Sequence, residues 1–375
     1  MTTGPMNTGP TPRPGILEIT PYVGGESSAN AKRLIRLASN EGALGTSPAA
    51  KAAYEVAAAE LHRYPDGGST ALRETIAEIH GLNVDQIVCG AGSDELIALL
   101  TRAYAGPGDE VLYSRHGFLM YPLSAMACGA TPVAAPEPGL KADVDLVLAS
   151  VTDRTRIVFI ANPNNPTGSY LSTAEIERLH AGLPAHVLLV IDAAYAEYVD
   201  APDYSAGAAL AESTTNVVMT RTFSKIYGLS ALRLGWAYCP PGIADILNRI
   251  RGPFNVSLPA QKAGEAAIRD TDFIERSRAH NEQWRDWTAA ALSDLGLKVH
   301  PSVCNFLLVD FAGIPGISAE DARIALKDQG ILVRQMGAYG LPTCLRIGIG
   351  LEDEMRPVIE AMRTVMAGAG QAATG

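Results

Sequence analysis

The sequence predicts an α/β protein with a mostly parallel sheet, helices on both faces of that sheet, and a second, smaller α+β lobe. Two observations lead to this prediction. Short apolar runs alternate with amphipathic stretches through the middle of the chain, which is typical of strands buried in a parallel sheet. After position 270 the pattern changes to a long helical stretch followed by short strands. A chain of 375 residues has room for one large and one smaller domain.

The apolar runs give the expected strands of the large domain, which are residues 86–89, 110–113, 156–161, 186–191, 216–220 and 234–239. Helical periodicity between them is clearest at 94–104 and 172–181. In the small lobe we expect helices at 270–295, 319–329 and 352–366, and strands at 305–309, 331–334 and 345–349. The predicted domains are a disordered extension (1–13), an N-terminal arm that joins the small domain (14–45), a large domain (46–265) and a small domain (266–375).

Composition excludes several classes of function. The net charge of −10 argues against nucleic-acid binding, which requires a basic face. No apolar run reaches the length of about 18 residues that a membrane span needs, and the N-terminus lacks the apolar core of a secretory signal. The five cysteines are scattered, without the spacing of a metal site. The sequence therefore predicts free thiols in a reducing cytoplasm, no metal and no membrane.

Lys225 is the first candidate for chemistry. Most lysines are solvated surface charges, but this one follows a predicted strand and has hydroxyls at Thr222 and Ser224, with Arg233 further on. A lysine amine can form a Schiff base with an aldehyde cofactor. Hydroxyls and an arginine can then bind the phosphate of that cofactor.

Two further candidates follow predicted strands. Asp192 ends a very apolar strand; it could cap a turn, or it could face a pyridine nitrogen and keep that ring protonated, with Tyr195 beside the ring oxygen. The loop 162–168 holds two Asn-Pro steps and ends in Gly168, which turn chemistry alone can explain. Ligands also bind at such loops, where the amide of Asn165 could contact the cofactor.

The turn from Gly90 to Glu95 follows a strand and opens a helix, so its backbone N–H groups can bind an anion. It is not a dinucleotide fingerprint, because Glu95 stands where the third glycine belongs. In the small lobe, Arg334 and Arg346 border apolar strands, where an unpaired charge is costly. Their forked guanidinium groups indicate an anionic substrate.

These motifs, in this order, resemble the fold-type-I pyridoxal 5′-phosphate (PLP) aminotransferases, and most of all the histidinol-phosphate aminotransferase family. The resemblance runs from Pro14 to about Met366 and implies an aspartate-aminotransferase-like fold with a seven-stranded, mostly parallel sheet. It is also carried by Pro14-Gly15-Ile16, Pro21-Tyr22-Val23, Ser39-Asn40-Glu41, Arg63-Tyr64-Pro65-Asp66 and Leu345-Arg346-Ile347. Two departures lie near the family's substrate side: Gly42-Ala43 where Asn-Pro is common, and Gly348 where Ser or Thr is frequent.

The resemblance implies a role for each matching residue. Lys225 would hold PLP covalently and move protons, Asp192 would pair with the pyridine nitrogen, and Tyr195 would contact the ring oxygen. The other implied PLP contacts are Asn165 at the ring oxygen, Phe118 on the ring face, and Ser93, Asp94 (backbone), Thr222, Ser224 and Arg233 at the phosphate. Tyr64 would reach that phosphate from the neighbouring subunit of a homodimer. The substrate would be bound by Tyr22, Asn165, Arg334 and Arg346.

The implied activity is ping-pong transamination between histidinol phosphate and 2-oxoglutarate in histidine biosynthesis. Three alternatives stay open at the level of sequence. One is an aromatic amino-acid aminotransferase of the same family, and another is a decarboxylase of a phosphorylated amino acid with the same fold. The third is a non-catalytic PLP-binding or regulatory module, against which the intact Lys225, Asp192, Asn165 and Arg233 argue.

Overall fold

Seven strands form the central sheet of the large domain, in the order β2-β8-β7-β6-β5-β3-β4. All neighbours run parallel except β8, which is antiparallel to β2 and to β7. The strands are β2 Ile87–Gly90, β3 Glu110–Ser114, β4 Thr131–Ala135, β5 Thr155–Ala161, β6 Leu188–Asp192, β7 Val217–Thr222 and β8 Gly235–Tyr238. This computed structural model describes residues 12–13, 15–22, 24–26 and 33–372, with side chains in the last helix described as far as residue 368.

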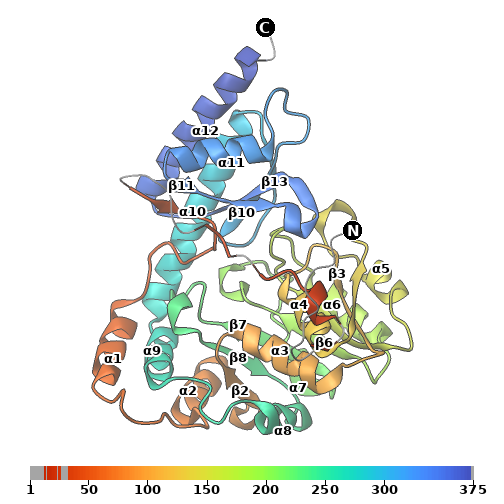
Figure 1. The fold of residues 1–375 in the computed structure, drawn as a ribbon. Helices are drawn as coiled ribbons and strands as arrows, with labels where there is room; N and C mark the ends of the chain where they lie inside the picture. The colour runs from red at the N-terminus through yellow and green to blue at the C-terminus, as the bar shows by residue number, and fades with distance from the viewer. Residues whose placement is uncertain (1–11, 14, 23, 27–32, 373–375) are drawn as a thin grey trace, which may run out of the picture.

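Helices cover both faces of this sheet, because alternate residues of a strand point to opposite faces (Figure 1). Ile160 and Ile191 belong to a core that includes α1, α2, α5, α6, α7 and α9. Phe159 and Val190 belong to a second core with α3, α4 and α8. The helices are α1 Pro48–Ala58, α2 Thr70–His80, α3 Ser93–Tyr104, α4 Met120–Cys128, α5 Val144–Ala149, α6 Thr173–Gly182, α7 Ala208–Ser213, α8 Pro241–Ile250 and α9 Leu258–Arg269.

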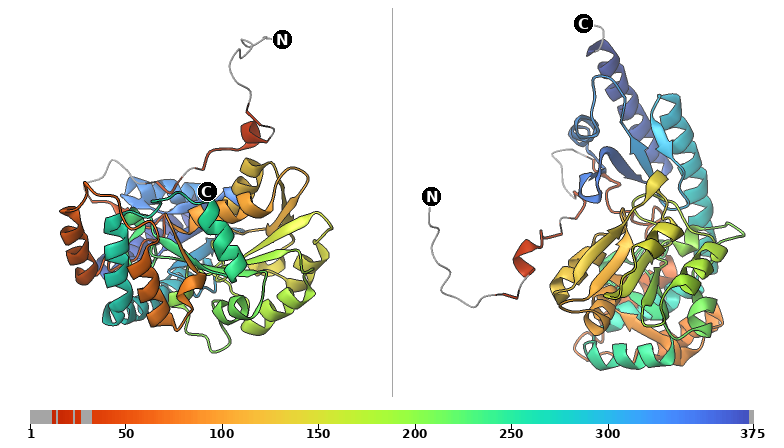
Figure 2. Two further views of the ribbon diagram at one scale, coloured as in Figure 1. Left: turned by 90° about the horizontal axis from the view of Figure 1, so that it is seen from below. Right: turned by 90° about the vertical axis from the view of Figure 1, so that its right-hand side faces the viewer.

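The small lobe is built around a four-stranded antiparallel sheet in the order β12-β13-β10-β9. Its strands are β9 Lys298–His300, β10 Phe306–Asp310, β12 Arg334–Met336 and β13 Leu341–Gly348, and its helices are α10 Thr271–Asp294, α11 Ala319–Asp328 and α12 Glu352–Ala372. The strand β1 (Ile35–Arg36) pairs in parallel with β11 (Ile331–Leu332), so the N-terminal segment joins this lobe. Figure 2 shows the lobe on one side of the large domain.

The predicted fold class is confirmed: the large domain has a mostly parallel seven-stranded sheet between helices, and an α+β lobe follows. Three strands were not predicted, β1, β4 and β9, and the predicted strand at 331–334 is divided between β11 and β12. The helix α9 continues past the predicted boundary between residues 265 and 266 and contributes Ile268 to the large-domain core. The domain boundaries themselves stay a prediction.

Most of the predicted N-terminal extension (residues 1–11), together with Pro14 and Val23 of the quoted motifs, lies outside the described residues. Within the described part of the chain, none of the helices combines the length and apolar character that crossing a bilayer requires.

Candidate active site

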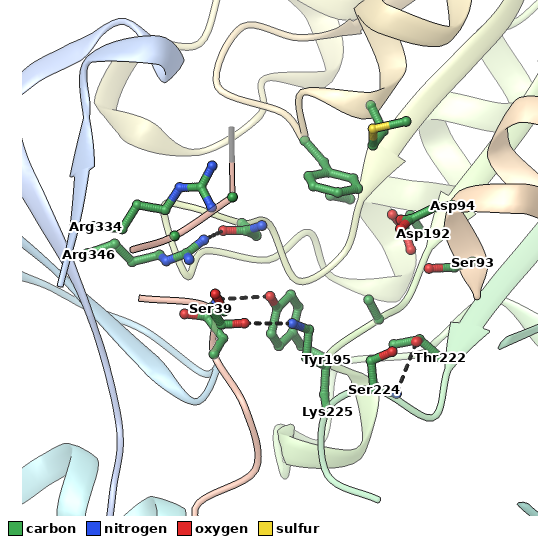
Figure 3. A pocket seen from close by; sticks show the side chains of 18 of the residues that line it. Ser39, Ser93, Asp94, Asp192, Tyr195, Thr222, Ser224, Lys225, Arg334 and Arg346 are labelled. Atoms are coloured by element: carbon green, nitrogen blue, oxygen red, sulfur yellow. Dashed lines mark hydrogen bonds between the residues drawn. The ribbon is translucent and has the colours of Figure 1, made fainter. Parts of the chain in front are cut away.

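A cavity of about 280 Å³ opens between the two lobes, at the carboxyl ends of β5, β6 and β7. Every site residue predicted from the sequence lines it, with the exception of Tyr64. In Figure 3, Arg334 and Arg346 lie on one side of the cavity, and Lys225 and Tyr195 lie in the middle. The other side holds Ser93, Asp94, Thr222 and Ser224. Ligands bind at this edge of open α/β sheets.

Lys225 lies in the loop that follows β7, and its Nζ donates a hydrogen bond to the Ser39 carbonyl at 3.1 Å. The ammonium also lies 5.5 Å from the centroid of the Tyr195 ring. Burial, and after it the positive charge of Arg346, lower the pKa of Lys225 from 10.5 to about 8. A substantial fraction of this amine is therefore neutral near pH 8, which is the form that attacks a carbonyl carbon.

Asp192 ends β6, and its carboxylate is buried in the floor of the cavity. The Tyr121 hydroxyl donates to Oδ2 at 2.8 Å, and the Thr220 hydroxyl donates to Oδ1 at 3.1 Å. Burial nevertheless raises the pKa of Asp192 from 3.8 to about 6, although both hydrogen bonds act to lower it. A carboxylate in this position would be stabilised by a cationic group brought close to it.

A pocket for an anion is built from the start of α3 and the loops after β7. Arg233 Nη1 donates to the Ser224 hydroxyl at 3.1 Å, and Nη2 donates to Asp94 Oδ2 at 3.2 Å. The Thr222 hydroxyl accepts from the Ser224 backbone N–H at 3.1 Å. Ser93 begins α3, so the positive end of the helix dipole and its free N–H groups face the same side of the cavity.

Tyr195 and Asn165 lie between the two ends of the cavity. Asn40 Nδ2 donates to the Tyr195 hydroxyl at 2.9 Å, and burial raises the pKa of Tyr195, so the phenol is protonated at neutral pH. Asn165 Oδ1 accepts a hydrogen bond from Nη1 of Arg346, which leaves the amide nitrogen of Asn165 as a donor.

Arg334 and Arg346 are directly opposite each other on β12 and β13. Like charges in such a pair are destabilising, and an anion between them relieves the repulsion. The buried Arg346 donates through Nη2 to the Ala38 carbonyl at 2.6 Å, while its buried Nε has no acceptor among the described residues. Arg334 lies 5.2 Å from the centroid of the Tyr22 ring. This end of the cavity is therefore a second candidate site for an anion.

Phe118 lines the cavity and meets Tyr121 edge-on, with 6.0 Å between ring centroids. Tyr64 is the one predicted residue that the fold places elsewhere. It is 82% exposed and stacks on Phe254, with 4.6 Å between centroids. Its side chain does not line the cavity of its own chain.

Four residues that the sequence did not single out support these side chains: Ser39, Asn40, Tyr121 and Thr220. Ser39 and Asn40 belong to the Ser39-Asn40-Glu41 motif, which indicates the family but did not predict a role for either residue. Tyr121 lies in an apolar helix and Thr220 inside a strand, where nothing in the sequence separates them from ordinary core residues.

The residues present fit the PLP that the resemblance implies. A Cβ on Gly92, which has φ +88°, would lie 2.4 Å from Nη2 of Arg233, so the missing side chain leaves room for the guanidinium beside the helix start. The amine of Lys225 is tuned toward its neutral form, and the buried Asp192 lacks a cationic partner of its own among the hydrogen bonds described above. An aldehyde, a pyridine nitrogen and a phosphate would each find a matching group.

Comparison with known proteins agrees with this geometry. The sequence model of the family "Aminotransferase class I and II" matches residues 32–362. The histidinol-phosphate aminotransferase of Rhodospirillum centenum is 64% identical over 356 residues, which cover 95% of this chain and 98% of the relative. The histidinol-phosphate aminotransferase of Paramagnetospirillum magneticum is 57% identical, with 95% and 98% covered.

Solved structures give the same result. Histidinol-phosphate aminotransferase from Sinorhizobium meliloti, solved in complex with PLP, has a TM-score of 0.88 at 28% identity, with 97% of this chain and 99% of that chain covered. An aspartate aminotransferase mutant of Thermus thermophilus, 22% identical with a TM-score of 0.79, shares the fold, with 90% of this chain and 97% of that chain covered. The chain therefore belongs to the class I and II aminotransferases, and within them to the histidinol-phosphate aminotransferase family.

Proposed function

We propose that the protein is a PLP-dependent histidinol-phosphate transaminase. It would convert histidinol phosphate and 2-oxoglutarate to imidazole acetol phosphate and glutamate, in histidine biosynthesis. The relatives named above, at 57–64% identity over nearly the whole chain, support this substrate assignment. The observation that carries the proposal is the pair of anion sites in one cavity, with Lys225 between them (Figure 3).

One of these sites would hold the cofactor. Ser93, the backbone of Asp94, Thr222, Ser224 and Arg233 would bind the phosphate of PLP, and Lys225 would hold its aldehyde carbon. Asp192 would pair with the pyridine nitrogen, Phe118 would pack on the ring face, and Asn165 and Tyr195 would contact the ring oxygen. Bound there, PLP supplies an electron-withdrawing ring that takes up the electron pair released when a Cα–H bond breaks.

Lys225 would be the group that moves the proton. Its amine opens into the cavity beside Tyr195, and burial and Arg346 keep its pKa near 8. A base works best when its pKa lies close to the working pH, so this amine can both accept and return a proton. The hydrogen bond from Asn40 fixes Tyr195, whose ring lies beside the amine.

The second anion site would bind the substrates. Arg334, Arg346 and Tyr22 would bind the phosphate of histidinol phosphate in one half-reaction and a carboxylate of 2-oxoglutarate in the other. A guanidinium fork suits both groups, so one site can serve both. Arg346 also donates a hydrogen bond to Asn165, the residue predicted to lie beside the cofactor ring. Arg346 would therefore contact both the substrate anion and Asn165.

The active unit would be a homodimer in the cytoplasm. Tyr64 is exposed and does not line the cavity of its own chain, which suits a residue that completes the phosphate pocket of a second copy. All five cysteines are free thiols, as a reducing compartment favours.

A donor screen on the PLP-loaded protein tests the substrate. Histidinol phosphate should give a higher kcat/KM than histidinol, phenylalanine or tyrosine, because only it carries the phosphate for the two arginines. Arg334→Gln should lower kcat/KM about tenfold to a hundredfold for histidinol phosphate and for 2-oxoglutarate alike, the scale of a lost hydrogen bond to a charged group. A preference for aromatic amino acids, or CO2 release without 2-oxoglutarate, would assign the chain to an alternative reaction.

A further inference from the structure

A second group of reactive side chains lies on the small-lobe sheet, outside the cavity described above. His300, Asp310 and Cys344 come from β9, β10 and β13, which are neighbouring antiparallel strands. Cys344 is directly opposite Asp310, and His300 is opposite Leu308. Residues two apart on a strand share a face, so all three side chains project from one face of the sheet.

The donor atoms of this cluster converge, and the Cys344 thiol also shares a side-chain hydrogen bond with Asp310. One atom from each residue lies within 4.8 Å of the other two. His300 Nε2 is 4.0 Å from Asp310 Oδ2, too far for a hydrogen bond, and this buried nitrogen has no hydrogen-bond partner among the described residues. The other oxygen of Asp310 is fixed, because Oδ1 accepts from the Ala312 N–H at 2.9 Å.

We propose that His300, Asp310 and Cys344 form a binding site for a thiophilic divalent cation such as Zn²⁺. Imidazole nitrogen, carboxylate oxygen and thiolate sulfur are the donors that Zn²⁺ takes in proteins. Zinc bonds of about 2.0–2.2 Å in a tetrahedral arrangement place the nitrogen and oxygen roughly 3.4 Å apart, so the 4.0 Å gap closes with a small side-chain adjustment. Water would occupy the fourth position.

The charges of the cluster suit a cation of charge +2. Asp310 and a thiolate at Cys344 supply two negative charges, and His300 coordinates as the neutral imidazole. Burial, together with the nearby charge of Lys298, lowers the pKa of His300 and so favours that neutral form. Burial, and after it the negative charge of Asp310, raise the pKa of Cys344 to about 11, so the metal-free site holds a thiol. Zn²⁺ must displace that proton to solvent when the Zn–S bond forms.

The place of the cluster in the fold gives the cation a structural consequence. The strand β9 has three residues and lies at the edge of the sheet. Shortly after it, the Val303 N–H donates to the Gly168 carbonyl in the Asn165-bearing loop at 3.1 Å. A cation would tie this short edge strand to β10 and β13 through side chains, so binding should stabilise the folded protein.

Zinc titration of the PLP-loaded protein, freed of metal with a chelator, tests the site by competition with a chromophoric indicator. We expect one Zn²⁺ per chain. His300→Gln and Cys344→Ser should each weaken binding at least about tenfold. Cys128→Ser removes a half-buried thiol from α4 and serves as the matched control, with unchanged affinity. Zn²⁺ should raise the Tm of the unmodified protein and of the control, and not that of the two ligand variants.

Cobalt gives an independent readout. Co²⁺ bound through sulfur should add a charge-transfer band that Cys344→Ser lacks, read as a difference spectrum against the cobalt-free protein. Asp310→Asn replaces either ligand variant that fails to fold, as judged by its metal-free Tm. Zinc binding that is absent, or that survives the ligand substitutions unchanged as an adventitious ion would, overturns the proposal. None of these outcomes depends on transaminase activity.

Discussion

Lys225 owes its lowered pKa first to burial and second to the positive charge of Arg346. The same arginine donates to Asn165 and lies opposite Arg334, so one guanidinium joins the substrate end of the cavity to the reactive amine. In the proposed function, the positive charge of Arg346 therefore has two roles. It binds the substrate anion, and it keeps Lys225 reactive near neutral pH.

Reconstitution of the PLP-free protein tests this link. Lys225 is reactive only as the free amine, so the rate of PLP attachment should rise with pH, with a midpoint near pH 8, and level off only at higher pH. Arg346→Gln removes a nearby positive charge, so the pKa of Lys225 and the midpoint of the profile should move upward. Arg249→Gln, at an exposed arginine on α8, should leave the midpoint in place. An unmoved midpoint in Arg346→Gln would contradict the account.

Asp192 should make the cofactor-free protein less stable above pH 6. Its pKa rises from 3.8 to about 6 on folding, so its cost is absent near pH 4, grows between these values and is complete above them. The difference corresponds to roughly 3 kcal/mol. Asp192→Asn should therefore raise the Tm of the PLP-free protein at about pH 7.5, by an amount that disappears near pH 4.

Tyr121→Phe is the matched comparison for this prediction. It removes a hydrogen bond that favours the charged carboxylate, so it should lower the Tm of the PLP-free protein at neutral pH. Equal stability of Asp192→Asn and the unmodified protein at every pH would show that burial of this carboxylate carries no cost.

At the scale of elements, the phosphate pocket depends on how α3 begins. Gly92 precedes the helix with φ +88°, and a Cβ there would meet Nη2 of Arg233 at 2.4 Å. Gly92→Ala should displace the guanidinium and weaken PLP binding about tenfold or more, the cost of a lost charge-assisted contact. Fluorescence titration of the PLP-free protein with PLP measures this.

Gly108→Ala separates backbone strain from contact. Gly108 has φ +94°, and a Cβ there would meet no atom within 4 Å. Both variants should lose roughly 1–3 kcal/mol of stability, because each places a Cβ on backbone with a positive φ that favours glycine, while only Gly92→Ala should lose PLP affinity. Equal PLP affinity in the two variants would remove the role assigned to Gly92.

The elements that the sequence predicted well are those with one dominant pattern. The buried strands β5, β6 and β7 and the amphipathic helices α3, α6 and α11 lie within a few residues of their predicted positions. The strands β4 and β9 were missed because they lie at sheet edges and are partly exposed; β4 also contains Pro132, which the edge of a sheet tolerates. The strand β1 was missed because it has only two residues.

The site shows the same limit. Lys225, Asp192 and Arg233 could be predicted from their residue types and from their positions after predicted strands. Tyr121 and Thr220 do not, because their role arises only when α4 and β7 bring two hydroxyls to one carboxylate. The cluster of His300, Asp310 and Cys344 was missed for a similar reason: its members are distant in sequence and meet only through the register of three strands.

At the scale of the whole molecule, the proposed homodimer predicts a specific result for hybrids. Tyr64→Ala and Lys225→Ala chains, expressed together, should form mixed dimers in which one site has both Lys225 and the Tyr64 of the other chain. That site should bind PLP with normal affinity, and the doubly defective site should not attach it. Affinity as weak as in the Tyr64→Ala homodimer would place Tyr64 in its own subunit's site instead.

In the proposed function, Lys225 lies between two anion sites and serves the transamination of histidinol phosphate. Single-turnover spectroscopy tests it most directly. Mixing the PLP-loaded protein with histidinol phosphate, without 2-oxoglutarate, should remove the visible absorbance of the lysine-bound cofactor and release one carbonyl product per site. Adding 2-oxoglutarate should restore the absorbance and yield glutamate, and Lys225→Ala should do neither. An absorbance that histidinol phosphate leaves unchanged, while an aromatic amino acid removes it, would contradict the account.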